Sequence, residues 1–150
     1  MIRVQREDFD VGAEVAALTR GRPGIGGIVS FVGVVREAAD GDPILALTLE
    51  HYPGMTERAL EEIDREAQRR WPLEATLIVH RYGRLEPGAR IVLVITASAH
   101  RAAAFESCEF LVDWLKTKAP FWKLEETPAG PRWVEARTTD DEAADRWTKA

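Results

Sequence analysis

The sequence has little cysteine and no long apolar run. Its 150 residues include one cysteine, Cys108, which excludes an internal disulfide and any cysteine-rich metal site. No apolar stretch approaches the roughly 20 residues that a membrane-spanning helix needs. Residues 1–12 carry charges where a secretory signal peptide would be apolar. The sequence therefore predicts a cytoplasmic protein with no membrane partner.

A surplus of positive charge is also lacking. The chain has 20 Lys and Arg against 25 Asp and Glu, for a formal net charge of -5 at pH 7. This charge gives no general attraction to nucleic acid or to an anionic membrane, so any anion site must be a local arrangement. The three histidines, His51, His80 and His100, lack the short spacing of metal ligands, so no metal site is expected.

What the chain does have is enough apolar sequence for one core. At 45% hydrophobic residues we expect a single domain over residues 1–150, since we find no repeat or linker. The patterns predict strands at 2–6, 28–36, 44–52, 75–85 and 89–99 with two more within 121–137, and helices at 10–20, 55–71 and 100–119 with a helical turn at 140–147. The predicted class is α+β, with a mixed or mainly antiparallel sheet and packed helices.

Cations gather near the end of the long helix, in the stretch "DWLKTKAPFWKLEE". Lys116 and Lys118 differ by about 200° around a helix, so they do not face one pocket. Pro120 ends the helix and lets the chain fold back toward Lys123. Neighbouring aromatic rings partly desolvate these amines, which lowers an amine pKa and suits it to proton transfer or nucleophilic chemistry. We predict that Lys116 and Lys123 form the functional pair. The alternative is that all three lysines are solvated and stabilised by the helix dipole.

Other cations stand at the ends of predicted elements. His100 and Arg101 open the long helix, where backbone N–H groups favour an anion. Arg36 ends a buried strand before residues 37–43, which read as a mobile loop, and strand ends beside loops often line sites. The alternative is that Ser98 caps the helix and both arginines are merely solvated.

The long helix presents two apolar faces. Phe110 and Trp114 point away from the main stripe, whose members are Ala104, Phe105, Cys108, Leu111, Val112 and Leu115. Cys108 is therefore expected to be a core residue and not a nucleophile. Two apolar faces predict burial on two sides, one of them against a partner subunit.

Four strings in one order resemble a known family. They are "IVSFVGVVRE", "LTLEHYPGMTERAL", "HRYGRLEPG" and "SAHRAAAFESCEFLVDWLKTKAPFWKLEE". From about Gly27 to Trp147 the chain resembles the MoaE family, the large catalytic subunits of molybdopterin synthase, and "LEHYPGM" and "LKTKAPFWK" are long, specific strings. The resemblance implies an α/β hammerhead-type fold and a reaction that needs no metal or redox cofactor.

The resemblance also implies an activity and partners. The expected assembly is a homodimer of large subunits with a small ubiquitin-like subunit at each end, a heterotetramer. The C-terminal Gly-Gly thiocarboxylate of the small subunit would donate sulfur to cyclic pyranopterin monophosphate. Two transfers would form the dithiolene of molybdopterin.

The resemblance assigns residues to this chemistry. Lys116 and Lys123 match the family's catalytic lysines, and the substrate-binding candidates are Val34, Val35, Arg36, His100, Arg101, Leu124 and Glu125. A phosphate and a thiocarboxylate are both anions, so fixed cations suit such a pocket. Two alternatives remain, a non-catalytic module that docks a ubiquitin-like tail and a phosphate-ligand binding protein that acts alone.

Overall fold

The computed structural model of the protein describes residues 1–134 and 138–148. Over these residues the elements in chain order are β1 (Ile2–Gln5), α1 (Val11–Thr19), β2 (Gly27–Val34), β3 (Ala38–Ala39), β4 (Asp42–Pro43), β5 (Ala46–His51), α2 (Met55–Arg70), β6 (Leu73–Arg81), β7 (Gly83–Leu85), β8 (Arg90–Ser98), α3 (Arg101–Lys118), β9 (Phe121–Thr127), β10 (Gly130–Trp133) and α4 (Thr138–Asp145). No helix in this part of the chain is long and apolar enough to cross a membrane. The predicted α+β class is confirmed.

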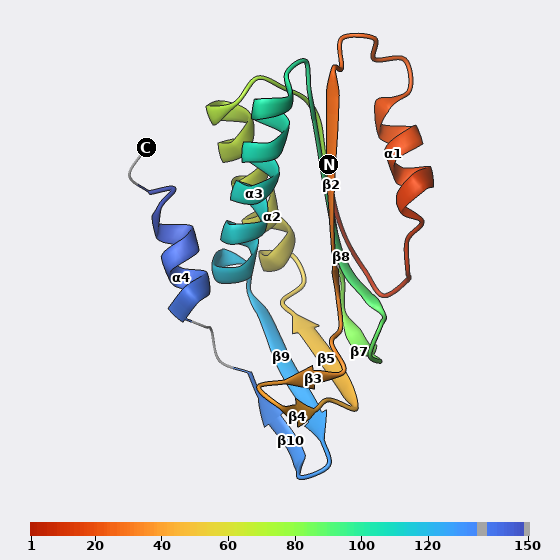
Figure 1. Ribbon diagram of the computed structural model, residues 1–150, viewed down its shortest axis with the longest axis vertical. Coiled ribbons are helices and arrows are strands. Elements are labelled where there is room, and N and C mark those ends of the chain that lie inside the picture. The colour runs from red at the N-terminus through yellow and green to blue at the C-terminus, as the bar shows by residue number, and fades with distance from the viewer. Residues whose placement is uncertain (135–137, 149–150) are drawn as a thin grey trace.

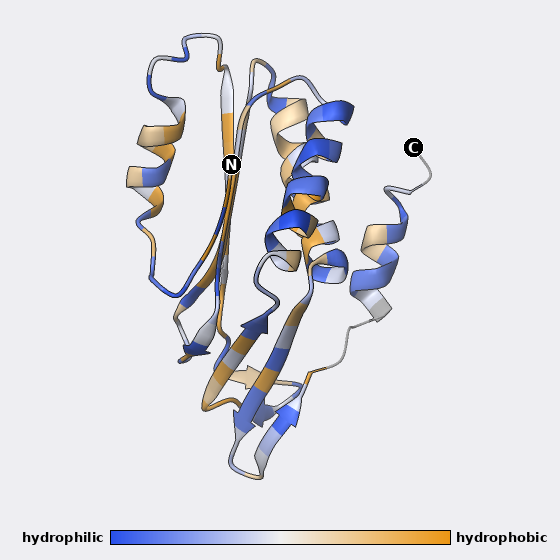
Figure 2. Ribbon diagram, turned by 180° about the vertical axis from the view of Figure 1, so that it is seen from behind, coloured by the Kyte–Doolittle hydropathy of each residue, from blue (hydrophilic) through white to orange (hydrophobic). Residues whose placement is uncertain are grey.

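The main sheet has the strand order β1-β6-β8-β2, in which β1 runs parallel to β6 and the other neighbours are antiparallel. Helices α2 and α3 cover one face of it and α1 covers the other (Figure 1). Strand β8 is buried from Val92 to Ser98 because both of its faces are covered. The outward side of α2 is hydrophilic, as expected for a helix with one face on a core (Figure 2).

A second sheet, of order β10-β9-β5-β7, continues beyond one end of the first. The sequence predicts one strand over residues 75–85. This prediction is wrong for residues 82–85, because the structure has two strands here, β6 and β7. The chain leaves the main sheet after Arg81, and β7 pairs with β5 in the second sheet. Gly83 has φ +96°, a conformation that side-chain-bearing residues rarely adopt, and it allows the change of direction.

Residues 37–43 form a small hairpin and not an irregular loop. Strands β3 and β4 pair across Asp40 and Gly41, which have φ of 51° and 84° as a tight hairpin turn requires. Ala39 is buried in the core of the second sheet, and the Arg132 guanidinium donates to the Asp42 carboxylate at 3.1 Å. The hairpin is therefore tied to β10.

The second apolar face of α3 is covered by the chain itself. Phe110 is fully buried beneath the Arg70 guanidinium, 4.9 Å from the ring centroid, and beside the Trp147 ring at 5.7 Å. The Phe110 face is therefore buried within the chain, so burial against a partner subunit stays a prediction for the other face. Phe105 from the other stripe is instead 62% exposed, while Cys108 is buried as expected.

Candidate active site

A pocket of about 600 Å³ lies where the two sheets meet the C-terminal end of α3. Its walls come from β2 and the residues after it, the end of α3, strand β9, and α4. The lining residues are Phe31, Val32, Gly33, Val34, Val35, Arg36, Ile44, Leu47, Ile91, Lys116, Thr117, Ala119, Phe121, Lys123, Glu125, Val134 and Asp140. Apolar walls with a few charged groups are typical of a small-molecule site.

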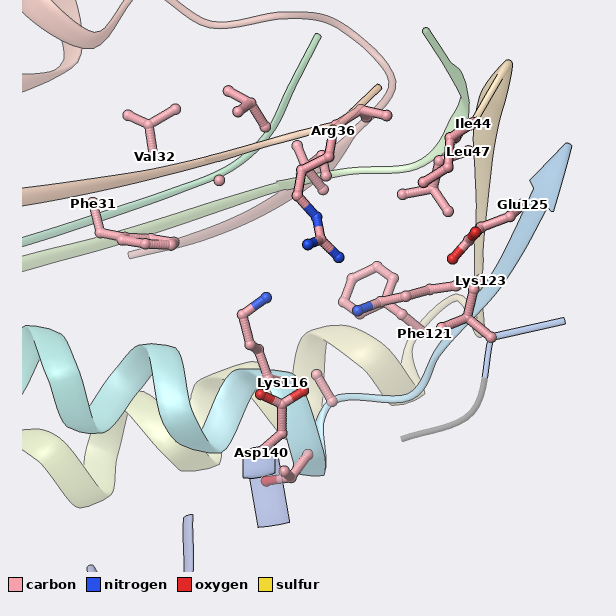
Figure 3. A pocket seen from close by; sticks show the side chains of 17 residues that line it. Phe31, Val32, Arg36, Ile44, Leu47, Lys116, Phe121, Lys123, Glu125 and Asp140 are labelled. Atoms are coloured by element: carbon pink, nitrogen blue, oxygen red, sulfur yellow. The ribbon is translucent and has the colours of Figure 1, made fainter. Parts of the chain in front are cut away.

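Three cations point into this pocket from three elements (Figure 3). Arg36 follows β2, Lys116 stands in the last turn of α3, and Lys123 lies on β9. The bend at Pro120 brings the two lysines to one pocket because β9 runs back along β5. Lys118 lies elsewhere, with its ammonium 4.7 Å from the centroid of the Trp114 ring.

The pocket wall also holds a buried carboxylate. Glu125 is 8% exposed, and its Oε2 accepts a hydrogen bond from Arg132 Nη2 at 3.0 Å. This bond and the one to Asp42 raise the pKa of the Arg132 guanidinium. Glu125 shares a face of β9 with Lys123, whereas Leu124 points to the opposite face and does not line the pocket. Val34 and Val35 do line it, beside Arg36.

His100 and Arg101 lie far from this pocket within one chain. They stand at the N-terminal end of α3, and Lys116 follows Arg101 by 15 residues, a rise of about 22 Å. Both side chains are exposed. The Ser98 hydroxyl accepts the His100 N–H at 3.3 Å, but His100 is itself the N-cap residue and no side chain caps the first turn of α3. The alternative that Ser98 caps this helix is therefore wrong.

Several pocket residues were missed by sequence reasoning. Asp140 enters from α4 beneath Lys116 (Figure 3), and Phe121 forms part of the wall next to Lys123. The polar segment around Asp140 predicts only a helical turn, so nothing local indicates a role. Phe31 belongs to a strand that reads as wholly core. The alternation along β9 does place Phe121 on the same face as Lys123.

A neutral histidine lies behind the pocket wall. His80 is 4% exposed and stacks on Phe121, with ring centroids 3.7 Å apart and planes 17° apart. Burial, together with the nearby charges of Lys123 and Lys116, lowers the pKa of His80 to about 3. Across residues 1–134 and 138–148, no group of three or more His, Cys, Asp or Glu side chains is arranged to hold a metal ion.

Known proteins resemble this chain in sequence and in fold. The family model described as MoaE protein matches residues 4–118. The chain belongs to the MoaE family. The molybdopterin synthase catalytic subunit of Pseudomonas aeruginosa is 58% identical over 146 residues, covering 97% of each chain. That of Escherichia coli is 54% identical over 146 residues, again covering 97% of each.

Solved structures of MoaE proteins superpose closely on the chain. The molybdopterin biosynthesis MoaE protein of Burkholderia ambifaria has a TM-score of 0.85 and 57% identity, covering 99% of this chain and 97% of that one. A molybdopterin synthase structure from Staphylococcus aureus has a TM-score of 0.82 at 30% identity, covering 89% of this chain and 96% of that one. The MoaE fold is therefore kept across a wide range of sequence identity.

Proposed function

We propose that this chain is the catalytic subunit of a molybdopterin synthase and acts in the cytoplasm as a single domain. It transfers sulfur from the thiocarboxylated C-terminus of a small ubiquitin-like subunit to cyclic pyranopterin monophosphate. The relatives that match it along nearly its whole length are named molybdopterin synthase catalytic subunits, which supports this activity.

The observation that carries the proposal is the convergence of Arg36, Lys116 and Lys123 on one pocket in a protein of net charge -5. A cyclic phosphate and a thiocarboxylate each bring negative charge, and more develops as sulfur adds and oxygen leaves. Fixed cations stabilise that charge. In our assignment Lys116 supplies a proton or a fixed positive charge, and Lys123 orients the tail or the substrate.

The remaining assigned residues have supporting roles. Glu125, Val34 and Val35 form part of the wall. The side chain of Leu124 points away from the pocket, so the only role that we propose for it is a backbone contact to the bound tail or substrate. His100 and Arg101 stand too far along α3 to serve the pocket of their own chain. We propose that they bind the anionic substrate in the pocket of a second copy, within a homodimer that carries one small subunit at each end.

Reconstitution tests this function. The purified chain is mixed with a thiocarboxylated small subunit and cyclic pyranopterin monophosphate, and the dithiolene product is measured. We expect molybdopterin to form. Binding of the small subunit without product would instead support a non-catalytic docking module, and tight binding of the precursor without the small subunit would support a phosphate-ligand binding protein.

A further inference from the structure

The bend at Pro120 decides how the two pocket lysines lie relative to each other, and a buried hydroxyl contacts it from behind. Thr56, in the first turn of α2, has no exposed surface. Its Oγ1 lies 3.4 Å from the Pro120 carbonyl oxygen, to which it donates, and it accepts the Tyr52 N–H at 3.0 Å. The hydroxyl thus links the start of α2 to the bend between α3 and β9.

The string "LEHYPGM" builds the turn that places this hydroxyl. Gly54 has φ +84° and precedes the first residue of α2. Its N–H donates to the Glu57 carboxylate at 2.5 Å, and the Thr56 N–H donates to the Tyr52 carbonyl at 2.9 Å. These bonds fix the helix start, so the string has a structural purpose that does not depend on acid or base chemistry by its side chains.

A second buried group holds the residue after the bend. The His80 ring stacks on Phe121, and its Nδ1 lies 2.8 Å from the Arg81 carbonyl oxygen. Because a carbonyl oxygen only accepts, Nδ1 carries the proton and the ring has a fixed orientation. The imidazole is neutral, so it stacks on Phe121 without placing a buried charge beside the lysines.

Thr56 and His80 therefore contact consecutive residues, Pro120 and Phe121, from two other elements. Neither residue lines the pocket. Phe121 does line it, and Lys123 follows two residues later on the same face of β9. A shift of the bend would move Lys123 relative to Lys116.

We propose that Thr56 and His80 are positioning residues for the lysine pair, holding the bend at Pro120 and Phe121 so that Lys116 and Lys123 meet at the correct spacing. The inference rests on the proposed function, since it concerns the reaction of that pocket. A displacement of about 1 Å at a reacting centre can reduce turnover by as much as about 100-fold.

The kinetic test uses Thr56→Val, which removes the hydroxyl and keeps the shape, in the complete reconstituted synthase. We expect kcat to fall about tenfold to 100-fold with KM changed less than about twofold. Thr56→Ser retains the hydroxyl and should restore kcat. Thr96→Val is the matched control, because Thr96 is also fully buried and its hydroxyl also donates to a backbone carbonyl, that of Ala104, near the other end of α3.

A second measurement is independent of turnover. The chain has four lysines, at positions 116, 118, 123 and 149, so ¹³C-dimethylation gives a small set of lysine NMR signals that Lys→Arg variants assign. Thr56→Val and His80→Leu should move the signals of Lys116 and Lys123 and leave that of Lys118 in place. Thr96→Val should leave all three unchanged.

The outcomes separate the two proposals. If the wild-type chain forms no molybdopterin, the proposed function fails, while the NMR signals still test whether the bend holds the lysines. Wild-type kcat in Thr56→Val, a loss of kcat equal to that of Thr96→Val, or unmoved lysine signals would each overturn the positioning role. Should His80→Leu fail to fold, the Thr56 series alone decides the question.

Discussion

Lys116 and Lys123 lie on opposite sides of the bend at Pro120 and line the same pocket. One stands in the last turn of a helix and the other on a strand that returns along β5. Their shared pocket is therefore a product of the bend. Lys118, two residues beyond Lys116, is turned away and stacks its ammonium over Trp114.

Replacing either pocket lysine should abolish most of the activity without unfolding the protein. We expect Lys116→Ala and Lys123→Ala each to reduce the conversion of precursor to molybdopterin strongly, because each removes a fixed cation from the site of developing negative charge. The free energy of unfolding should change by less than about 1 kcal/mol, as for other substitutions away from the core. Product formation and chemical denaturation measure the two effects.

The control for this prediction is Lys118→Ala, which removes an equal charge from the same helix end outside the pocket. It should retain wild-type turnover. Full turnover by the Lys116 variant would remove the central role assigned to that amine.

The ion pair of Arg132 with Glu125 should stabilise the protein more than its exposed counterpart on the same sheet. Glu125 is buried, so Arg132→Met leaves a carboxylate without its partner in a poorly solvated place and also frees the hairpin at Asp42. Arg84→Met breaks the pair with Glu126, which is better solvated. Thermal unfolding should show the larger fall in Tm for Arg132→Met, and equal falls would contradict this account.

Local patterns in the sequence predict most elements and the lysine pair, because helix periodicity and the stop at Pro120 depend only on neighbouring residues. The other half of the pocket depends on tertiary contacts. Asp140 reaches it because α4 packs on α3, where Trp114 Nε1 donates to the Ala144 carbonyl oxygen at 3.2 Å. The break at Gly83 was missed because a single glycine inside a strand is only a weak signal of a bend, and which sheet β7 joins depends on its pairing with β5.

Burial of neutral His80 predicts a particular dependence of stability on pH. Its pKa is about 3 in the folded state, below the ordinary 6.5, because of burial and of positive charge on Lys123 from β9, Lys116 from α3 and His51 from β5. Between these values the unfolded chain binds a proton that the folded chain does not. The free energy of unfolding therefore falls as the pH falls through this window, by up to about 1.4 kcal/mol per pH unit.

Denaturation of wild type and His80→Leu between about pH 6.5 and 5 measures this effect above the ordinary pKa values of the carboxyl groups. The variant should show the shallower dependence on pH. His100→Leu, which removes an exposed histidine, should keep the wild-type slope. Parallel curves for wild type and His80→Leu would mean that His80 does not carry the dependence.

The distance from Arg101 to Lys116 along α3 predicts complementation between chains. Arg101→Ala and Lys116→Ala should each be nearly inactive as pure dimers, because every pocket then lacks one cation. When equal amounts are co-expressed, half of the dimers are mixed. In a mixed dimer one pocket combines the intact Lys116 of one chain with the intact Arg101 of the other, so activity should return to roughly a quarter of the wild-type level for a two-fold symmetric dimer. No recovery in the mixed preparation, with mixed dimers shown to be present, would mean that Arg101 does not act across the dimer.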